Sequence, residues 1–170
     1  RLIPDGPGPD EVLRRLRVYF EVRPFGGTAR ELGAELEAAD RPAFGLYGPG
    51  GLYLVALRRL PDPGSGWPED RPEAWRQVDV GLAQVLIVER AFGVDDPGRL
   101  GYTRDLAEAV GQVDAGRYRW AVILRPPRVE EVVALARAGV EMPPKSTYFY
   151  PKPLSGLVLA PLDQELPEAL

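Results

Sequence analysis

The chain has 170 residues, of which 45% are apolar and 27% charged, proportions typical of a globular domain and too apolar for disorder along the whole length. Its net charge of −4 argues against nonspecific nucleic-acid binding, which needs a dense basic surface. Cysteine and histidine are absent, which excludes disulfides, thiolate nucleophiles and imidazole bases, and we expect no metal site. No apolar run approaches the roughly 20 residues that span a bilayer, and no signal peptide is visible, so we expect a cytoplasmic protein without membrane contact.

The first sixty residues contain two helix patterns and one hairpin pattern. Apolar residues recur at helical spacing after Asp10 and after Thr28, and both residues are expected to cap their helices, with Glu31 completing a capping box. Two apolar runs flank the sequence GPGG, which is typical of a β-hairpin. The expected elements are a strand end at 1–3, a helix at 11–20, an extended piece at 21–25, a helix at 29–40, and hairpin strands at 43–47 and 52–58.

The segment 61–74 is crowded with turn-forming residues, which indicates a surface loop or a subdomain linker, anchored by Trp67 and Trp75. After it, Asp79 is expected to cap a strongly apolar and mostly buried helix that ends at Gly93. The elements expected in the remainder are a short strand at 100–103, a helix at 104–116, a strand at 117–126, a helix at 128–139 and a final strand at 155–162.

This order of helices and strands, without strict alternation, predicts an α+β fold. We expect one domain over residues 1–170, with a mixed or mainly antiparallel sheet packed against several amphipathic helices. Because the first residue is Arg1 rather than methionine, we also expect the chain to be part of a longer protein.

The most distinctive segment is MPPKSTYFYPKP at 142–153, which holds the only two lysines of the chain. Its prolines predict a stiff, extended backbone, on which successive side chains alternate in direction. One side would carry Lys145, Thr147 and Phe149, and the other Ser146, Tyr148 and Tyr150. A lysine beside hydroxyls on an ordered backbone is a pattern for binding phosphate. The candidate ligand-binding residues are Lys145, Ser146, Thr147, Tyr148, Tyr150 and Lys152.

Composition alone favours a plainer interpretation of this segment, with aromatic side chains packed on the core and lysines in solvent. The retention of both lysines in a chain that otherwise uses arginine favours the binding interpretation instead. Three other patterns have weaker functional interpretations. The glycine-rich stretch 45–53 favours a hairpin over a nucleotide loop, the carboxylates at 94–96 favour a turn over a metal site, and 117–125 fits either an edge strand or a nucleic-acid surface.

The stretch AGVEMPPKSTYFYPKPLSGLVL resembles the C-terminal end of the domain of unknown function 1015 family, which consists of bacterial and archaeal proteins. The stretches FGLYGPGGLYLVALR, DVGLAQVLIVERAFGV, YTRDLAEAVGQVDAG and AVILRPPRVEEVVALARAG are similar to that family in the same order. Members are about twice as long, and their N-terminal half resembles ParB and sulfiredoxin-like proteins, a fold whose relatives include small-metabolite kinases. The resemblance therefore implies that this chain is the C-terminal portion of a longer protein. The family often has histidine where this chain has Gln84.

Two functional hypotheses follow for the 142–153 motif. In the first, the motif forms one wall of a nucleotide or phosphorylated-metabolite site shared with the protein's own N-terminal half, and the whole protein is a phosphotransferase whose isolated C-terminal part is inactive. In the second, the domain is a non-catalytic scaffold that supports the N-terminal half or forms a homodimer, with the motif as a docking strand. The sequence identifies no catalytic residue and no definite cofactor.

Overall fold

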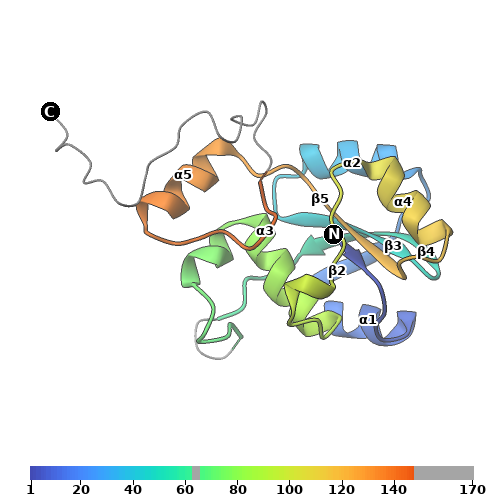
Figure 1. The fold of residues 1–170 in the computed structure, drawn as a ribbon, viewed down its shortest axis with the longest axis horizontal. Coiled ribbons are helices and arrows are strands. Elements are labelled where there is room, and N and C mark those ends of the chain that lie inside the picture. The colour runs from blue at the N-terminus through green and yellow to red at the C-terminus, as the bar shows by residue number, and fades with distance from the viewer. Residues whose placement is uncertain (63–65, 148–170) are drawn as a thin grey trace, which may run out of the picture.

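The computed structural model describes residues 1–62 and 66–147, and within them five strands form one sheet in the order β1-β5-β3-β4-β2 (Figure 1). All neighbouring strands run antiparallel, so the fold is α+β, and the sheet that was expected to be mixed or mainly antiparallel is antiparallel throughout. The strands are β1 (Leu2–Ile3), β2 (Phe20–Pro24), β3 (Ala43–Gly48), β4 (Gly51–Leu57) and β5 (Trp120–Leu124).

Two layers of helices cover the sheet. The α-helices are α1 (Pro9–Leu16), α2 (Ala29–Ala38), α3 (Asp79–Leu82), α4 (Leu106–Asp114) and α5 (Val129–Arg137). A π-helix, Ala83–Ala91, continues α3, and short 3-10 helices lie at Glu73–Gln77 and Pro97–Arg99. In Figure 1, α2 and α4 lie above the sheet and α1 lies below it, while α5 stands apart at one end of the molecule.

The two faces of the sheet bury different sets of side chains. The larger core lies between one face and the helices α1 and 79–91, with Phe20, Phe44 and Trp120 fully buried within it. The opposite face packs against Leu32 and Leu36 of α2, and against α4 through a smaller cluster. Alternation along the strands accounts for this division, because successive side chains point to opposite faces.

The first residues of the helices show which of the predicted helix caps are present. Thr28 caps α2 and forms the expected capping box with Glu31, whose carboxylate accepts the Thr28 backbone N–H at 2.7 Å. The prediction that Asp10 is a cap is wrong, since α1 begins at Pro9 with Gly8 before it, and proline is well suited to a first helical position because it needs no partner for an N–H. The prediction for Asp79 is also wrong, because the helix cap is Val78.

Two strand predictions also need correction. The predicted strand at 100–103 is only a single bridge between Gly101 and Leu2, because the partner strand β1 is two residues long. The edge-strand interpretation of 117–125 is wrong, since β5 lies between β1 and β3. The hairpin around GPGG is confirmed: β3 and β4 pair in register up to Gly48 and Gly51. The final strand predicted at 155–162 lies outside the described residues.

Gly48 is required because the indole of Trp120 occupies the space beside it. A Cβ at position 48 would lie 2.2 Å from a ring carbon of Trp120, far inside van der Waals contact. Trp120 itself is fully buried and packs edge-on against Phe92, with ring centroids 5.7 Å apart. The hairpin end and the helical layer are therefore fitted to each other through one aromatic ring.

We expect Gly48→Ala to lower the free energy of unfolding by about 2–3 kcal/mol, because the added methyl group must displace a ring that is packed on all sides. Gly111→Ala is the matched control: a Cβ there meets nothing within 4 Å, and the position lies inside α4. Alanine in a helix should stabilise by about 0.5–1 kcal/mol relative to glycine. Urea denaturation of both variants measures the contrast, and equal effects would contradict the assigned role of Trp120.

Candidate functional site

The predicted phosphate motif begins in the described part of the chain with a turn. Pro144 and Lys145 occupy the centre of this turn, and the hydroxyl of Ser146 donates a hydrogen bond back to the carbonyl of Pro143. The expectation of an extended backbone is therefore wrong at 144–145. A proline whose φ is fixed near −65° fits the first central position of a turn as readily as it fits an extended chain.

Lys145 is the one non-glycine residue of the described ranges with a positive φ, at 56°. This left-handed conformation crowds the side chain of an L-amino acid and costs about 1 kcal/mol or more. Lys145 and Thr147 are exposed, and Ser146 is half-buried. The turn thus presents the ammonium to solvent and uses the Ser146 hydroxyl for its own closure. Tyr148, Tyr150 and Lys152, the other predicted site residues, lie outside the described residues.

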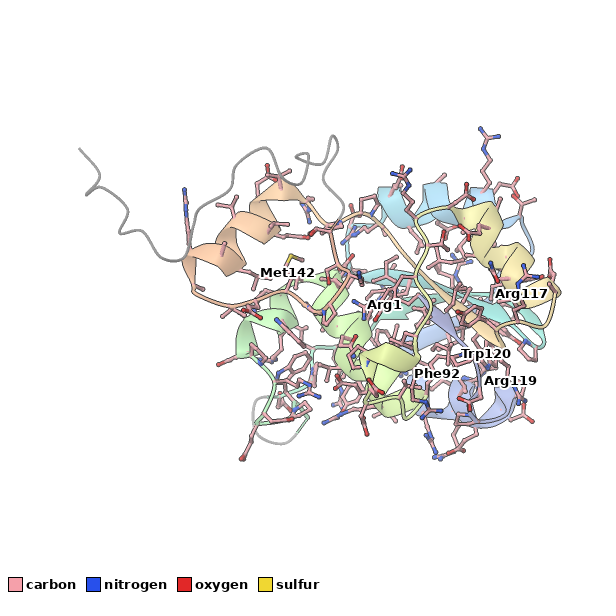
Figure 2. All side chains as sticks on the ribbon, in the orientation of Figure 1. Arg1, Phe92, Arg117, Arg119, Trp120 and Met142 are labelled. Carbon is pink, nitrogen blue, oxygen red and sulfur yellow. The ribbon has the colours of Figure 1, made fainter. Side chains whose placement is uncertain are left out.

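The turn is anchored to the domain through the residues that precede it. The indole N–H of Trp75 donates to the backbone carbonyl of Glu141 at 2.8 Å. Met142 packs with a small cluster in which Val78, Val80 and Leu135 are buried (its side chain is labelled in Figure 2). Because three residues span at most about 10 Å, the Cα of Lys145 must lie within that distance of the Met142 Cα. The backbone of the turn is therefore tethered close to the cluster that includes Val78 and Val80, at the start of α3.

An ion pair at the start of α3 joins three segments of the chain. Arg125, which follows β5, donates from Nε to the Asp79 carboxylate at 2.5 Å and from Nη1 to the carbonyl of Ala39 at 2.8 Å. The side chains of Asp79 and Arg125 are only 9% and 16% exposed. From the sequence, Asp79 was expected to cap a helix. The ion pair could not be predicted, because Arg125 is 46 residues away and no local pattern connects the two residues.

A surface groove lies beside this ion pair. It has a volume of about 430 Å3 and is lined by residues of β2, β3, β4 and α2 and by the loop that contains Ala39. Ion pairs cross its rim: Arg41 to Glu21 at 2.9 Å, and Arg23 to Glu35. Since both arginines are already paired with carboxylates, the groove is a poorer phosphate site than the Lys145 turn.

The π-helix carries the second polar cluster, which sequence reasoning missed. Gln84 is 3% exposed and accepts a hydrogen bond from the Arg1 guanidinium, while its own amide N–H donates to Glu89 at 3.0 Å. Glu89 in turn accepts from Arg71 at 3.2 Å. The wide π-helical turn places residues five apart on one face, so Gln84 and Glu89 meet. The one sequence signal here was that Gln84 stands where the family that the sequence resembles often has histidine.

The electrostatics of this cluster centre on Arg1. Burial lowers the pKa of its guanidinium, an effect opposed by the nearby Tyr102 and Glu89. Burial also raises the pKa of Tyr102, whose ring centroid lies 5.8 Å from the guanidinium carbon. The Nη2 of Arg1 is buried without a hydrogen-bond partner among the described residues. The other polar groups of the cluster are hydrogen-bonded to one another. The cluster is therefore a structural polar network that links the start of β1 to the helix 79–91.

The other segments that the sequence left open to a functional role have structural roles. Trp120 is fully buried and Tyr118 packs in a core cluster, so neither aromatic of the 117–120 stretch is available to stack on a base. Asp96 accepts the backbone N–H of Gly98 at 2.8 Å and so caps a 3-10 turn, as the turn interpretation predicts. Trp67 is buried and donates from its indole to the Arg71 carbonyl at 3.2 Å, which anchors its loop.

The comparisons with known proteins give no match: no family model, no curated protein and no solved structure is similar to this chain. Across the residues that the structure describes, no group of three or more carboxylates is placed to hold a metal ion. In those same ranges, no helix has both the length and the apolar character needed to cross a membrane.

We expect Asp79→Asn to lower the free energy of unfolding by about 3 kcal/mol, because it leaves the Arg125 guanidinium enclosed without a counter-charge. The control is Glu21→Gln, which breaks the exposed pair with Arg41 and should cost less than about 1 kcal/mol. Urea denaturation measures both. If the Asp79 variant is no less stable than the Glu21 variant, the pair does not hold the three segments together.

Proposed function

We propose that this chain contributes one wall of a site for a phosphate-bearing ligand, either a nucleotide or a phosphorylated metabolite. The observation that carries the proposal is the backbone of Lys145, which adopts a left-handed conformation that asparagine or glycine would adopt at lower cost. Strain of this kind persists where a side chain is needed at one position, and the side chain here is a compact, exposed cation.

The anchoring of the turn supports the same proposal. Trp75 and Met142 fix the chain just before the turn, so the Lys145 ammonium loses less conformational freedom on binding than it would on a loose tail. The exposed hydroxyl of Thr147 is a donor to a phosphate oxygen two residues away. Tyr148, Tyr150 and Lys152 complete the proposed wall from the sequence pattern alone.

The resemblance to the domain of unknown function 1015 family supplies the other wall in this proposal. A ParB-like N-terminal half of a longer protein would face the turn, and the site would lie between the two parts. The whole protein would then act as a small-metabolite phosphotransferase, with Lys145 offsetting charge on the phosphates. We expect this chain alone to bind weakly and to turn over no substrate.

A second candidate is a non-catalytic scaffold that pairs with another protein surface. It is favoured by an independent observation, the exposed valines of α5.

We expect ATP to stabilise this chain against heat in a saturable manner, and Lys145→Gly to remove the effect. Ligand at 100 times its dissociation constant should add about 2.7 kcal/mol to the free energy of unfolding. In the absence of ATP, Lys145→Gly should be the more stable protein by up to about 1 kcal/mol, because glycine relieves the positive φ. A thermal-shift titration with ATP, repeated with inorganic phosphate, measures both quantities.

Arg30→Gly provides a charge-matched control, since Arg30 is an exposed cation on α2. Its ATP response should equal that of the unmodified chain. A Lys145→Gly variant that still responds to ATP as strongly as the unmodified chain would remove Lys145 from the site. If Lys145→Gly is more stable than the unmodified chain without ATP and no longer responds to ATP, the strained backbone at Lys145 is explained by ligand binding.

A further inference from the structure

The helix α5 carries an apolar stripe that faces away from the domain. Val129, Val132, Val133 and Ala136 recur at the i, i+3, i+4, i+7 spacing of one helix face, and we call them the α5 stripe. Val129 is 64% exposed and Val133 38% exposed. Leu135, the buried residue of α5, lies about 100° further round the helix, so the stripe is separate from the face that attaches α5 to the domain.

These valines are not explained by helix formation. Valine loses side-chain freedom in a helix and is a poorer helix former than alanine or leucine, a cost that burial normally offsets. Apolar side chains exposed singly are ordinary on a protein surface, and Val18 and Leu60 are of that kind. On α5, by contrast, the exposed Val129, Val133 and Ala136 share one continuous face with the half-buried Val132.

The charges beside the stripe indicate what covers it. Glu130 and Arg137 lie on the same flank of the helix, both exposed, and neither has a partner in the part of the chain that the structure describes. Seven residues separate them, which is about two turns and roughly 10 Å along the axis, too far for a pair within one helix. A partner with the opposite order of charges would satisfy both.

We propose that the α5 stripe is the contact of a homodimer in which α5 packs antiparallel against α5 of a second copy. Antiparallel helices related by a two-fold axis bring like flanks together, so Glu130 of each copy meets Arg137 of the other. A parallel pair, whose two-fold axis runs along the helices, brings opposite flanks together, so Glu130 and Arg137 would lie on different sides of the contact and would not meet. The stripe itself is self-complementary: Val129 faces Ala136 of the second copy, and Val132 faces Val133.

The size of the stripe sets the strength of this dimer. A helix of nine residues buries less than the roughly 1,200 Å2 of a standard interface, so the dimer belongs to the weak, reversible class. Its population should rise with protein concentration across the range from about 1 to 500 µM. The dimer is argued from other residues than the Lys145 turn, so failure of either proposal leaves the other standing.

Sedimentation equilibrium over that concentration range tests the interface. The unmodified chain should pass from monomer to dimer, Val133→Asp should stay monomeric, and Val18→Asp, at a matched exposed valine, should dimerise like the unmodified chain. A monomer at every concentration overturns the proposal. Loss of stability in Val133→Asp without any association in the unmodified chain overturns it too, since the stripe would then be covered within one chain.

Charge exchange tests the antiparallel orientation. Glu130→Arg and Arg137→Glu should each weaken dimerisation about tenfold, because each replaces two attractive contacts with two repulsive ones. The double variant restores both contacts and should return to within about threefold of the unmodified chain. A double variant as weak as either single variant overturns the pairing of Glu130 with Arg137.

The absence of cysteine from the chain allows a direct test of register. A mixture of Val129→Cys and Ala136→Cys proteins should give a heterodimer with a short bismaleimide, whereas Val129→Cys alone should give little product. Val18→Cys serves as the control for random collision. Efficient cross-linking of Val129→Cys to itself would show a parallel pair and overturn the antiparallel arrangement.

Discussion

The enclosed ion pair between Asp79 and Arg125 is the contact on which the positions of several segments depend. It joins the first residue of α3 to the chain that leaves β5, and the second hydrogen bond of Arg125 reaches the residue after α2. Charges removed from water are costly unless each is matched, so the pair favours the observed arrangement of the three segments over one that leaves either charge enclosed alone. One guanidinium therefore fixes the end of the sheet from which α5 and the Lys145 turn extend.

The lysine turn and the α5 stripe are both carried by the chain that follows this pair. The chain turns away at Pro126 and Pro127, forms α5, and returns to the start of α3 through Trp75 and Met142. This excursion has little core of its own, and it carries both of the features on which the two proposals rest. The sheet and its two helical layers supply the rigid support, which is the usual division of roles between a scaffold and a functional loop.

The sequence predicted the elements better than the contacts between them. Hydrophobic spacing and capping located α2 and the hairpin, since these signals are local. It could not reveal that Asp79 binds an arginine 46 residues away, or that Gly48 makes room for Trp120, because both facts depend on tertiary packing. The change from α-helix to π-helix after Leu82 was also hidden, since a strongly buried helix has no clear periodicity to read.

For the candidate site, the sequence singled out the segment by its composition, and its prediction of an extended backbone is wrong at 144–145. The rarity of lysine pointed to Lys145 at once, whereas the spacing of prolines suggested an extended chain where there is a turn. Proline restricts its own φ and disfavours helix before it, yet both turns and strands satisfy these limits. The network of Gln84, Glu89 and Arg1 had no motif of its own, because its members come from distant parts of the chain.

The attachment of α5 through one buried leucine has a consequence for local stability. A helix with so little buried contact should open far more often than the sheet, and its amide hydrogens should exchange with solvent well before those of β3 and β5. Each opening would also release Met142 and with it the support of the lysine turn. On the proposed function, a partner that holds α5 closed would thereby tighten phosphate binding at the turn without touching the ligand, a coupling that arises from shared opening rather than from a change of shape.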